Sequence, residues 1–123
     1  MTRPLVLVAE DDFNVRLTLE IVLEDEGFEL LLAADGEEAL AAARASHPDV
    51  ILLDQIMPKL DGKQVLHALR ADEATRDIPV LVLSGMERGL DSDWPGAHFV
   101  GKPFSPEELV RRIRALLPAD KSV

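Results

Sequence analysis

The sequence predicts an α/β fold in which a parallel β-sheet is covered by helices on both faces. Short aliphatic runs alternate with stretches of helical periodicity along the whole chain. Three of the runs consist almost entirely of Val, Ile and Leu, which is typical of strands buried on both faces. The chain has 123 residues, 47% of them hydrophobic, and no linker or low-complexity tract. These features indicate that residues 1–123 form a single domain.

Five apolar runs are expected to form the strands. They are Leu5 to Ala9, Phe28 to Ala33, Val50 to Leu53, Val80 to Leu83 and Ala97 to Val100. The second run is the weakest because Glu29 interrupts it. Repeated βαβ units favour right-handed crossovers, and ligands of such sheets bind outside the carboxyl ends of the strands.

Helical patterns lie between these runs. One is expected from Phe13 to Glu26, with Gly27 as its stop. Asp35 opens a second helix, which extends to about Ser46, through a capping box with Glu38. Asp61-Gly62-Lys63-Gln64 and Ser105-Pro106-Glu107-Glu108 are similar starting points for two more. Glycines and prolines interrupt the pattern between Ser84 and Val100, so any helix there is short, about Glu87 to Asp91.

The composition excludes several classes of function. Thirteen basic residues against 23 acidic ones give a net charge of −10, which argues against direct binding to nucleic acid or to anionic membranes. There is no Cys, so disulfides and thiolate chemistry are excluded. We see no signal peptide, and the longest aliphatic stretches are far shorter than the roughly 20 residues that span a bilayer. A cytoplasmic protein is therefore expected.

Polar residues follow the predicted strands. Glu10, Asp11 and Asp12 come after the first, Asp54 after the third, Ser84 after the fourth and Lys102 after the fifth. Clustered carboxylates repel one another unless a cation such as Mg²⁺ relieves the repulsion. Carboxylates, a lysine and a hydroxyl at one edge suit phosphoryl transfer, in which one carboxylate could be the nucleophile.

The motifs at these strand ends resemble those of the receiver domain of response regulators, the chemotaxis-regulator-like family of two-component signalling. They are Val8-Ala9-Glu10-Asp11-Asp12, Leu53-Asp54-Gln55-Ile56-Met57-Pro58-Lys59-Leu60-Asp61-Gly62, Leu83-Ser84-Gly85 and Lys102-Pro103-Phe104. Their occurrence together and in this order covers essentially the whole chain. The resemblance implies a doubly wound (βα)5 flavodoxin-like fold, with strand order 2-1-3-4-5 and a shortened or irregular fourth helix.

The resemblance also implies a role for each site residue. Asp54 would be the phosphoacceptor and a ligand of Mg²⁺. Asp11 would bind the metal directly, Glu10 largely through water, and Ile56 through its backbone carbonyl. Ser84 would hydrogen-bond the phosphoryl group, Lys102 would pair with it, and the bond before Pro103 would be cis. Phe99 stands where the family has an aromatic switch residue.

Three departures from the family affect what can be expected. Seventeen residues separate Ser84 from Lys102, about four fewer than usual, so output through the fourth helix is in doubt. Ile56 and Met86 are apolar where the family flanks the path of hydrolytic water, which predicts a long-lived phosphoryl group. The switch residue is Phe instead of the commoner Tyr, so switching would depend on burial alone.

The expected partners are a histidine kinase or phosphotransfer protein and an unknown downstream protein, with the chain a monomer or weak homodimer. The domain would catalyse only its own phosphorylation and dephosphorylation, either as a stand-alone regulator or relay shuttle or as a receiver excised from a longer protein. A Mg²⁺-dependent phosphatase is disfavoured because Ile56 occupies the position of its second carboxylate. An unphosphorylated interaction module is disfavoured by the intact site residues.

Other features have simpler explanations beside functional ones. Asp12 could lie near the metal or cap a helix. His47, His67 and His98 lack ligand spacing and are expected at the surface or in packing. Trp94 could anchor its loop or be an exposed contact. Eight acidic residues and no basic one lie between Leu17 and Ala43, which is either a solvated face or a surface that selects the phosphodonor.

Overall fold

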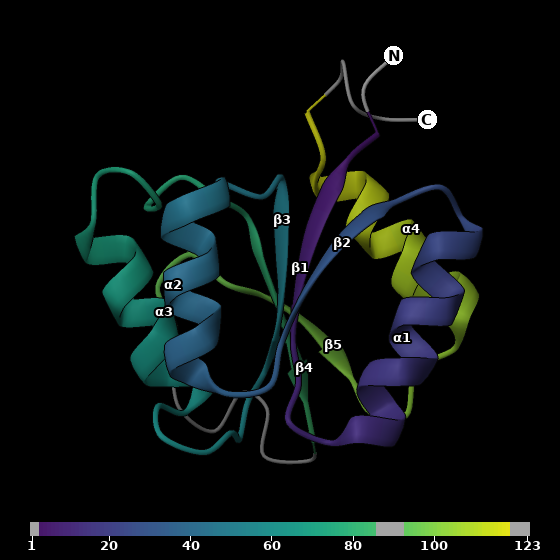
Figure 1. Ribbon diagram of the computed structural model, residues 1–123, viewed down its shortest axis with the longest axis horizontal. Helices are drawn as coiled ribbons and strands as arrows, with labels where there is room; N and C mark the ends of the chain where they lie inside the picture. The colour runs from purple at the N-terminus through teal and green to yellow at the C-terminus, as the bar shows by residue number, and fades with distance from the viewer. Residues whose placement is uncertain (1–2, 86–92, 119–123) are drawn as a thin grey trace.

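Five parallel strands form one sheet in the computed structural model, which describes residues 3–85 and 93–118 (Figure 1). The strands are β1 (Leu5–Ala9), β2 (Glu29–Ala33), β3 (Val50–Asp54), β4 (Val80–Ser84) and β5 (His98–Gly101). Their order is β2-β1-β3-β4-β5, and every neighbouring pair is parallel. The predicted fold class and strand order are confirmed.

Within the described residues, four helices cover the two faces of the sheet. They are α1 (Phe13–Asp25), α2 (Gly36–Ser46), α3 (Gly62–Ala71) and α4 (Pro106–Leu116). Figure 1 shows α1 and α4 on one face and α2 and α3 on the other, with the sheet between them. Because both faces are covered, all five residues of β3 and all five of β4 are buried.

Alternate residues of each strand enter different cores. Val6 and Val8 of β1 belong to the core beneath α1 and α4. Leu7 and Ala9 belong to the core beneath α2 and α3. This two-residue period follows from the strand geometry, in which successive side chains point to opposite faces. A slip of one residue in β1 would exchange the two sets, so both cores fix its register.

The structure shifts several predicted boundaries. Phe28 precedes β2 but is fully buried, and β5 starts at His98 instead of Ala97. Helix α1 ends at Asp25, one residue before the predicted end, and Gly27 follows with φ +94°. The described residues between β4 and β5 contain no helix, and the short one expected at Glu87 to Asp91 lies outside the described part of the chain.

Helix starts follow the predicted caps with one exception. Asp61 and Gln64 form the full capping box of α3, and the Ser105 hydroxyl accepts a hydrogen bond from the Glu108 N–H. At α2, Asp35 accepts from the Glu38 N–H, but the Glu38 carboxylate accepts from the N–H of Ala34 instead of Asp35. The box predicted there is therefore displaced by one residue.

Among the described residues, none of the helices has the length and apolar character needed to cross a bilayer.

Candidate functional site

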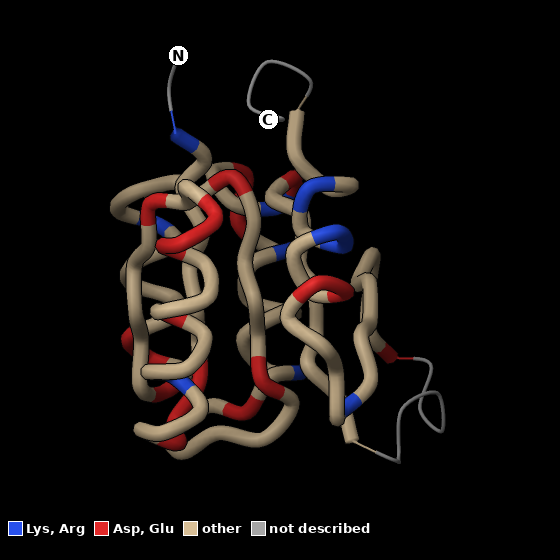
Figure 2. The backbone as a smooth tube through the Cα atoms, turned by 90° about the vertical axis from the view of Figure 1, so that its right-hand side faces the viewer, with Lys and Arg blue, Asp and Glu red and all other residues tan. Residues whose placement is uncertain are grey.

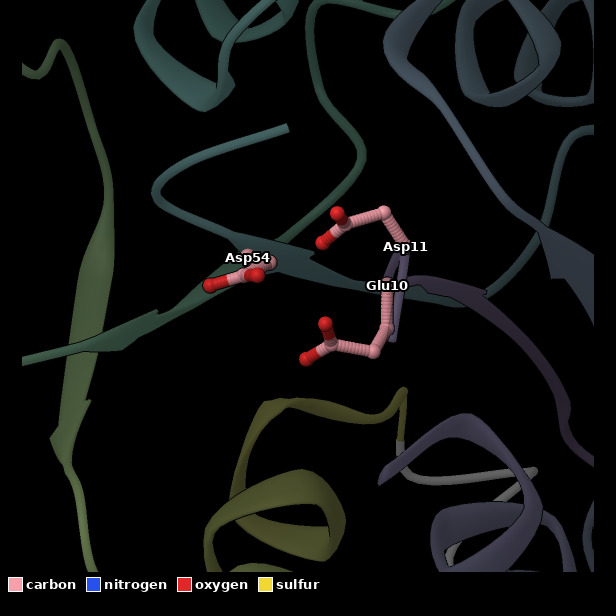
Figure 3. A group of neighbouring side chains, drawn as sticks. All are labelled: Glu10, Asp11 and Asp54. Carbon is pink, nitrogen blue, oxygen red and sulfur yellow. The ribbon is translucent and has the colours of Figure 1, made fainter. Parts of the chain in front are cut away.

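Three carboxylates meet at the carboxyl edge of the sheet (Figure 3). Glu10 and Asp11 directly follow β1, and Asp54 is the last residue of β3. Because β1 and β3 are neighbours in register, their ends bring the three side chains together. One oxygen of each carboxylate lies within 4.8 Å of the other two. Figure 3 shows the carboxyl groups approaching one another from the two strand ends.

Glu10 is the most unusual of the three acids. Its side chain is 2% exposed, and burial, which penalises the charged form, raises its pKa to about 7. A hydrogen bond from the Asp12 N–H to Glu10 Oε2 opposes this rise, and the nearby Asp54 carboxylate adds to it. The other oxygen, Oε1, is buried without a hydrogen-bond partner among the described residues. Such a group lacks the stabilisation that a cation would supply.

Lys102 brings a positive charge to the acids. Its Nζ donates to Asp54 Oδ1 at 3.0 Å, and Asp54 is itself 6% exposed. The Lys102 backbone N–H donates to the Ser84 carbonyl at 2.8 Å, which ties the end of β5 to the end of β4. The bond between Lys102 and Pro103 is cis, as the family resemblance implied.

Ser84 ends β4 and is completely buried. Its hydroxyl donates to the Gly85 carbonyl at 3.1 Å. The neighbouring strand ends at Asp54, which pairs in register with Leu83. The serine expected to contact a phosphoryl group therefore lies one strand away from the acids, with its proton engaged on the adjacent backbone.

The loop after β3 is held by close backbone packing. A Cβ at Gly62 would lie 2.5 Å from the carbonyl oxygen of Asp54, so only glycine allows this approach. A Cβ at Gly36 would lie 2.1 Å from the carbonyl oxygen of Leu60, which fixes the same loop against α2. Ile56, in this loop, is 77% exposed. The loop that contains Ile56 is thus positioned by two glycines.

Phe99 and Trp94 contact each other through their rings. Phe99 pairs in register with Val82 of β4 and packs, partly buried, against the core beneath α2 and α3. Trp94 packs against the same core, and the two ring centroids lie 5.9 Å apart in an edge-to-face arrangement. Trp94 is therefore an anchor of its loop, one of the two alternatives that the sequence left open.

Two further residues shape the acidic loop. Asp12 caps α1, accepting from the N–H groups of Asn14 and Val15, which is the simpler of its predicted roles. Arg16, which the sequence analysis missed, donates to the carbonyls of Glu10 and Asp11 at 2.8 and 3.4 Å. The sequence signal that could have identified Arg16 is its position, since it is a basic residue one turn into the helix that follows the acidic loop.

The donor set fits a hard divalent cation. All of the side-chain donors are carboxylate oxygens, the ligands that Mg²⁺ prefers, and one buried oxygen is unsatisfied. Lys102, whose Nζ lies 3.0 Å from Asp54 Oδ1, supplies a positive charge beside the same carboxylate. An anionic group bound beside Asp54 would therefore meet positive charge from two sources, provided that the metal is present.

Comparison with known proteins gives consistent results. A family model described as "Response regulator receiver domain" matches residues 6–114. The chain is 44% identical over 127 residues to the transcriptional regulatory protein PrrA of Mycobacterium tuberculosis, covering 95% of this chain and 51% of PrrA. The chain thus spans about half the length of this relative and of the others like it.

Solved structures share the fold. The chemotaxis response regulator CheY4 of Vibrio cholerae superposes with a TM-score of 0.87 at 31% identity, covering 94% of this chain and 100% of CheY4. The receiver domain of the sensor histidine kinase PA1611 from Pseudomonas aeruginosa superposes with a TM-score of 0.86 at 28% identity. That match covers 94% of this chain and 98% of the other, whose active-site cleft holds a coordinated magnesium ion.

Proposed function

Because the chain belongs to the response regulator receiver domain family, we propose that it accepts a phosphoryl group on Asp54 from a phosphohistidine donor. Receiver domains are the signalling domains of two-component systems. We propose that residues 1–123 act as one such domain, in keeping with their single sheet. The observation that carries the proposal is the Asp54 carboxylate, buried between two other acids and the Nζ of Lys102.

The chain's own residues supply the nucleophile and part of its charge compensation. An Asp54 oxygen forms a bond to phosphorus as the P–N bond to the donor imidazole breaks, and the electron pair of that bond stays on the imidazole nitrogen. Lys102 then pairs with the phosphoryl oxygens instead of the free carboxylate. Positioning and charge neutralisation dominate this class of reaction.

Mg²⁺ is the proposed cofactor, and bound magnesium would neutralise charge on the transferred phosphoryl group. Asp11, Asp54 and the Ile56 carbonyl would hold it, with Glu10 acting largely through water. The unsatisfied Glu10 oxygen and the meeting of three carboxylates support this assignment. The solved PA1611 receiver domain, with its coordinated magnesium ion, adds a precedent.

Signalling would follow from a shift between conformations. The Ser84 hydroxyl would give up its bond to the Gly85 carbonyl and donate to a phosphoryl oxygen. Phe99 pairs with Val82 of β4, the strand that also carries Ser84, and would respond as the switch residue. The phosphorylated state would be favoured only by the extra contacts that it makes.

The domain would also control the lifetime of its own phosphoryl group. Ile56 presents an apolar, highly exposed side chain beside the site, where it would hinder the approach of water. Met86, the second apolar residue invoked from the sequence, lies outside the described residues. We therefore propose slow self-catalysed dephosphorylation.

The proposed donor is a histidine kinase or phosphotransfer protein that docks on α1. This helix exposes Phe13, Leu17 and Ile21 at a spacing of four residues, with exposed fractions of 64%, 40% and 61%. Acidic residues follow at the end of the helix, and Figure 2 marks acidic positions of the backbone in red and basic ones in blue. An apolar stripe next to a negative rim suits a partner with the complementary pattern.

The downstream partner is proposed to be a protein, in the cytoplasm. PrrA is named as a transcriptional regulator, and this chain matches only half of it. The net charge of −10 disfavours DNA binding by these residues themselves. A monomer or weak homodimer is proposed for the chain in isolation.

Intact-mass measurement tests the proposal. Incubation with Mg²⁺ and a small phosphodonor should add about 80 daltons to the wild-type chain. Asp54→Ala should add nothing, whereas Asp25→Ala, a change of the same kind at an exposed acid, should behave as wild type. A gain that persists in Asp54→Ala would reject Asp54 as the acceptor.

A further inference from the structure

Helix α3 carries a basic stripe that contacts the segment leading into β5. Lys63, His67 and Arg70 are spaced by four and three residues, so they share one face of the helix. The segment from Asp93 to Ala97 lies against this face. Each of the three basic side chains contacts a different part of the segment.

Arg70 makes the tightest connection. Its guanidinium donates to the Pro95 carbonyl at 3.1 Å and to the Gly96 carbonyl at 3.4 Å. The same group donates to the carbonyls of Arg76 and Ile78, each at 2.9 Å. One side chain therefore fastens the segment both to α3 and to the loop before β4.

The other two basic residues hold the start of the segment. His67 Nε2 lies 2.9 Å from Asp93 Oδ1. Lys63 Nζ lies 5.8 Å from the centroid of the Trp94 ring, within the range of a cation–π interaction. Four consecutive residues, 93 to 96, are thus each tied to α3.

Trp94 connects this segment with two parts of the functional site. Its ring meets the ring of Phe99 edge to face. It also lines an open cavity of about 290 Å³ together with Gln55 and Ile56, the two residues that follow Asp54, and with Asp61 and Lys63. A movement of the loop after Asp54 would therefore alter the surroundings of the Trp94 ring, and so would a movement of Phe99.

We propose that Trp94 is a positioning residue that holds Phe99 in the arrangement seen here, and that the basic stripe of α3 acts as the latch for Trp94. This inference rests on the proposed phosphorylation of Asp54. Phosphorylation would weaken the contact between Trp94 and Phe99 and alter the exposed face formed by α3 and residues 93–97. This face would then report the state of the site.

The fluorescence of Trp94 provides a direct test, because it is the single tryptophan of the chain. In wild type, the emission should change as the mass gain appears. Lys63→Met removes the cation above the ring and should raise the rate of phosphorylation by a small donor about 2- to 5-fold, because the latched state is less favoured. Its affinity for Mg²⁺ should not change.

Two further variants separate a latch from a merely structural role. Arg70→Lys keeps the charge but loses the fork that binds several carbonyls, so it should increase quenching of Trp94 by acrylamide. Arg76→Lys, the same change at an exposed neighbour, should not. A structural defect would slow phosphorylation and lower the melting temperature, whereas the latch predicts faster phosphorylation.

The outcomes of these experiments distinguish the proposed latch from the proposed phosphorylation of Asp54. Mass gain without any change in Trp94 emission, or a Lys63→Met rate equal to that of wild type, would overturn the latch and leave the phosphoacceptor intact. A wild-type chain that gains no mass would overturn both.

Discussion

The Nζ of Lys102 lies 3.0 Å from Oδ1 of Asp54, although the two residues are 48 positions apart and their strands are not neighbours. Strand β4 lies between β3 and β5, so the lysine reaches across its end. The Lys102 N–H is bound to the Ser84 carbonyl there. The contact therefore fixes the order of three groups along one edge of the sheet, which are the Asp54 carboxylate, the end of β4 with Ser84, and the Lys102 ammonium group.

Removing the Lys102 charge should slow phosphorylation without preventing it. Lys102→Met leaves the acids in place but withdraws the cation that would face the phosphoryl oxygens. We expect a rate with a small phosphodonor lower by about 100-fold, the scale of losing one preorganised charge contact. Lys102→Arg should restore part of the rate. A Met variant as fast as wild type, measured by intact mass over time, would exclude this role.

The metal-free protein should lose stability as the pH rises toward neutrality. The Glu10 pKa is about 7 in the folded state against 4.5 ordinarily, so the folded state binds more protons between these values. The free energy of unfolding should therefore fall between about pH 4.5 and pH 7, by at most on the order of 3 kcal/mol from this group.

Glu10→Gln should flatten that dependence. The amide keeps an oxygen that can accept from the Asp12 N–H but has no proton to lose. Urea unfolding without metal, at about pH 5 and about pH 8, compares the two proteins. Equal pH dependence in wild type and variant would refute the assignment of the effect to Glu10.

Neighbouring aspartates offer a matched test of metal binding. Asp11→Asn removes a carboxylate from the acidic group and should weaken Mg²⁺ binding at least about 10-fold. Asp12→Asn retains a good helix cap and should bind Mg²⁺ as wild type does. The shift of the melting temperature with Mg²⁺ concentration measures both. Equal losses would mean that the cation is not held by Asp11.

Charge reversal on α1 should slow transfer from a protein donor at low salt. Glu24 and Glu26 both lie at the acidic end of the helix, but Glu26 pairs with Arg114 at 3.0 Å. Glu24→Lys is therefore the cleaner probe, and Glu73→Lys is an exposed control with the same net charge. Phosphotransfer from a cognate kinase should slow only in Glu24→Lys, and high salt should remove the difference. Equal rates would mean that α1 is only a solvated face.

The phosphoryl group on Asp54 should be long-lived. Ile56→Asp would replace the apolar side chain near the site with a carboxylate able to orient water, so it should shorten the lifetime. The decay of the added mass after removal of the donor measures the lifetime. A wild-type group lost within seconds would reject the proposed shielding.

The sequence by itself determined the layers and the helix caps, and the resemblance carried by its motifs implied the strand order. Hydrophobic runs and helical periodicity are local signals, so Leu5–Ala9 is predicted to the residue and Asp61 is correctly identified as a cap. The motifs also put acids at the ends of β1 and β3. Boundaries shifted where tertiary packing competed, as at Phe28, which is buried without belonging to a strand.

Only the tertiary structure decided how these ends meet. The raised pKa of Glu10 depends on burial and on Asp54, 44 positions along the chain, and neither is visible in a local pattern. The basic stripe of α3 likewise acquires its role from residues 93–97, which the fold brings against it. Periodicity reports which face of an element is apolar, whereas the energy of a charge depends on everything packed around it.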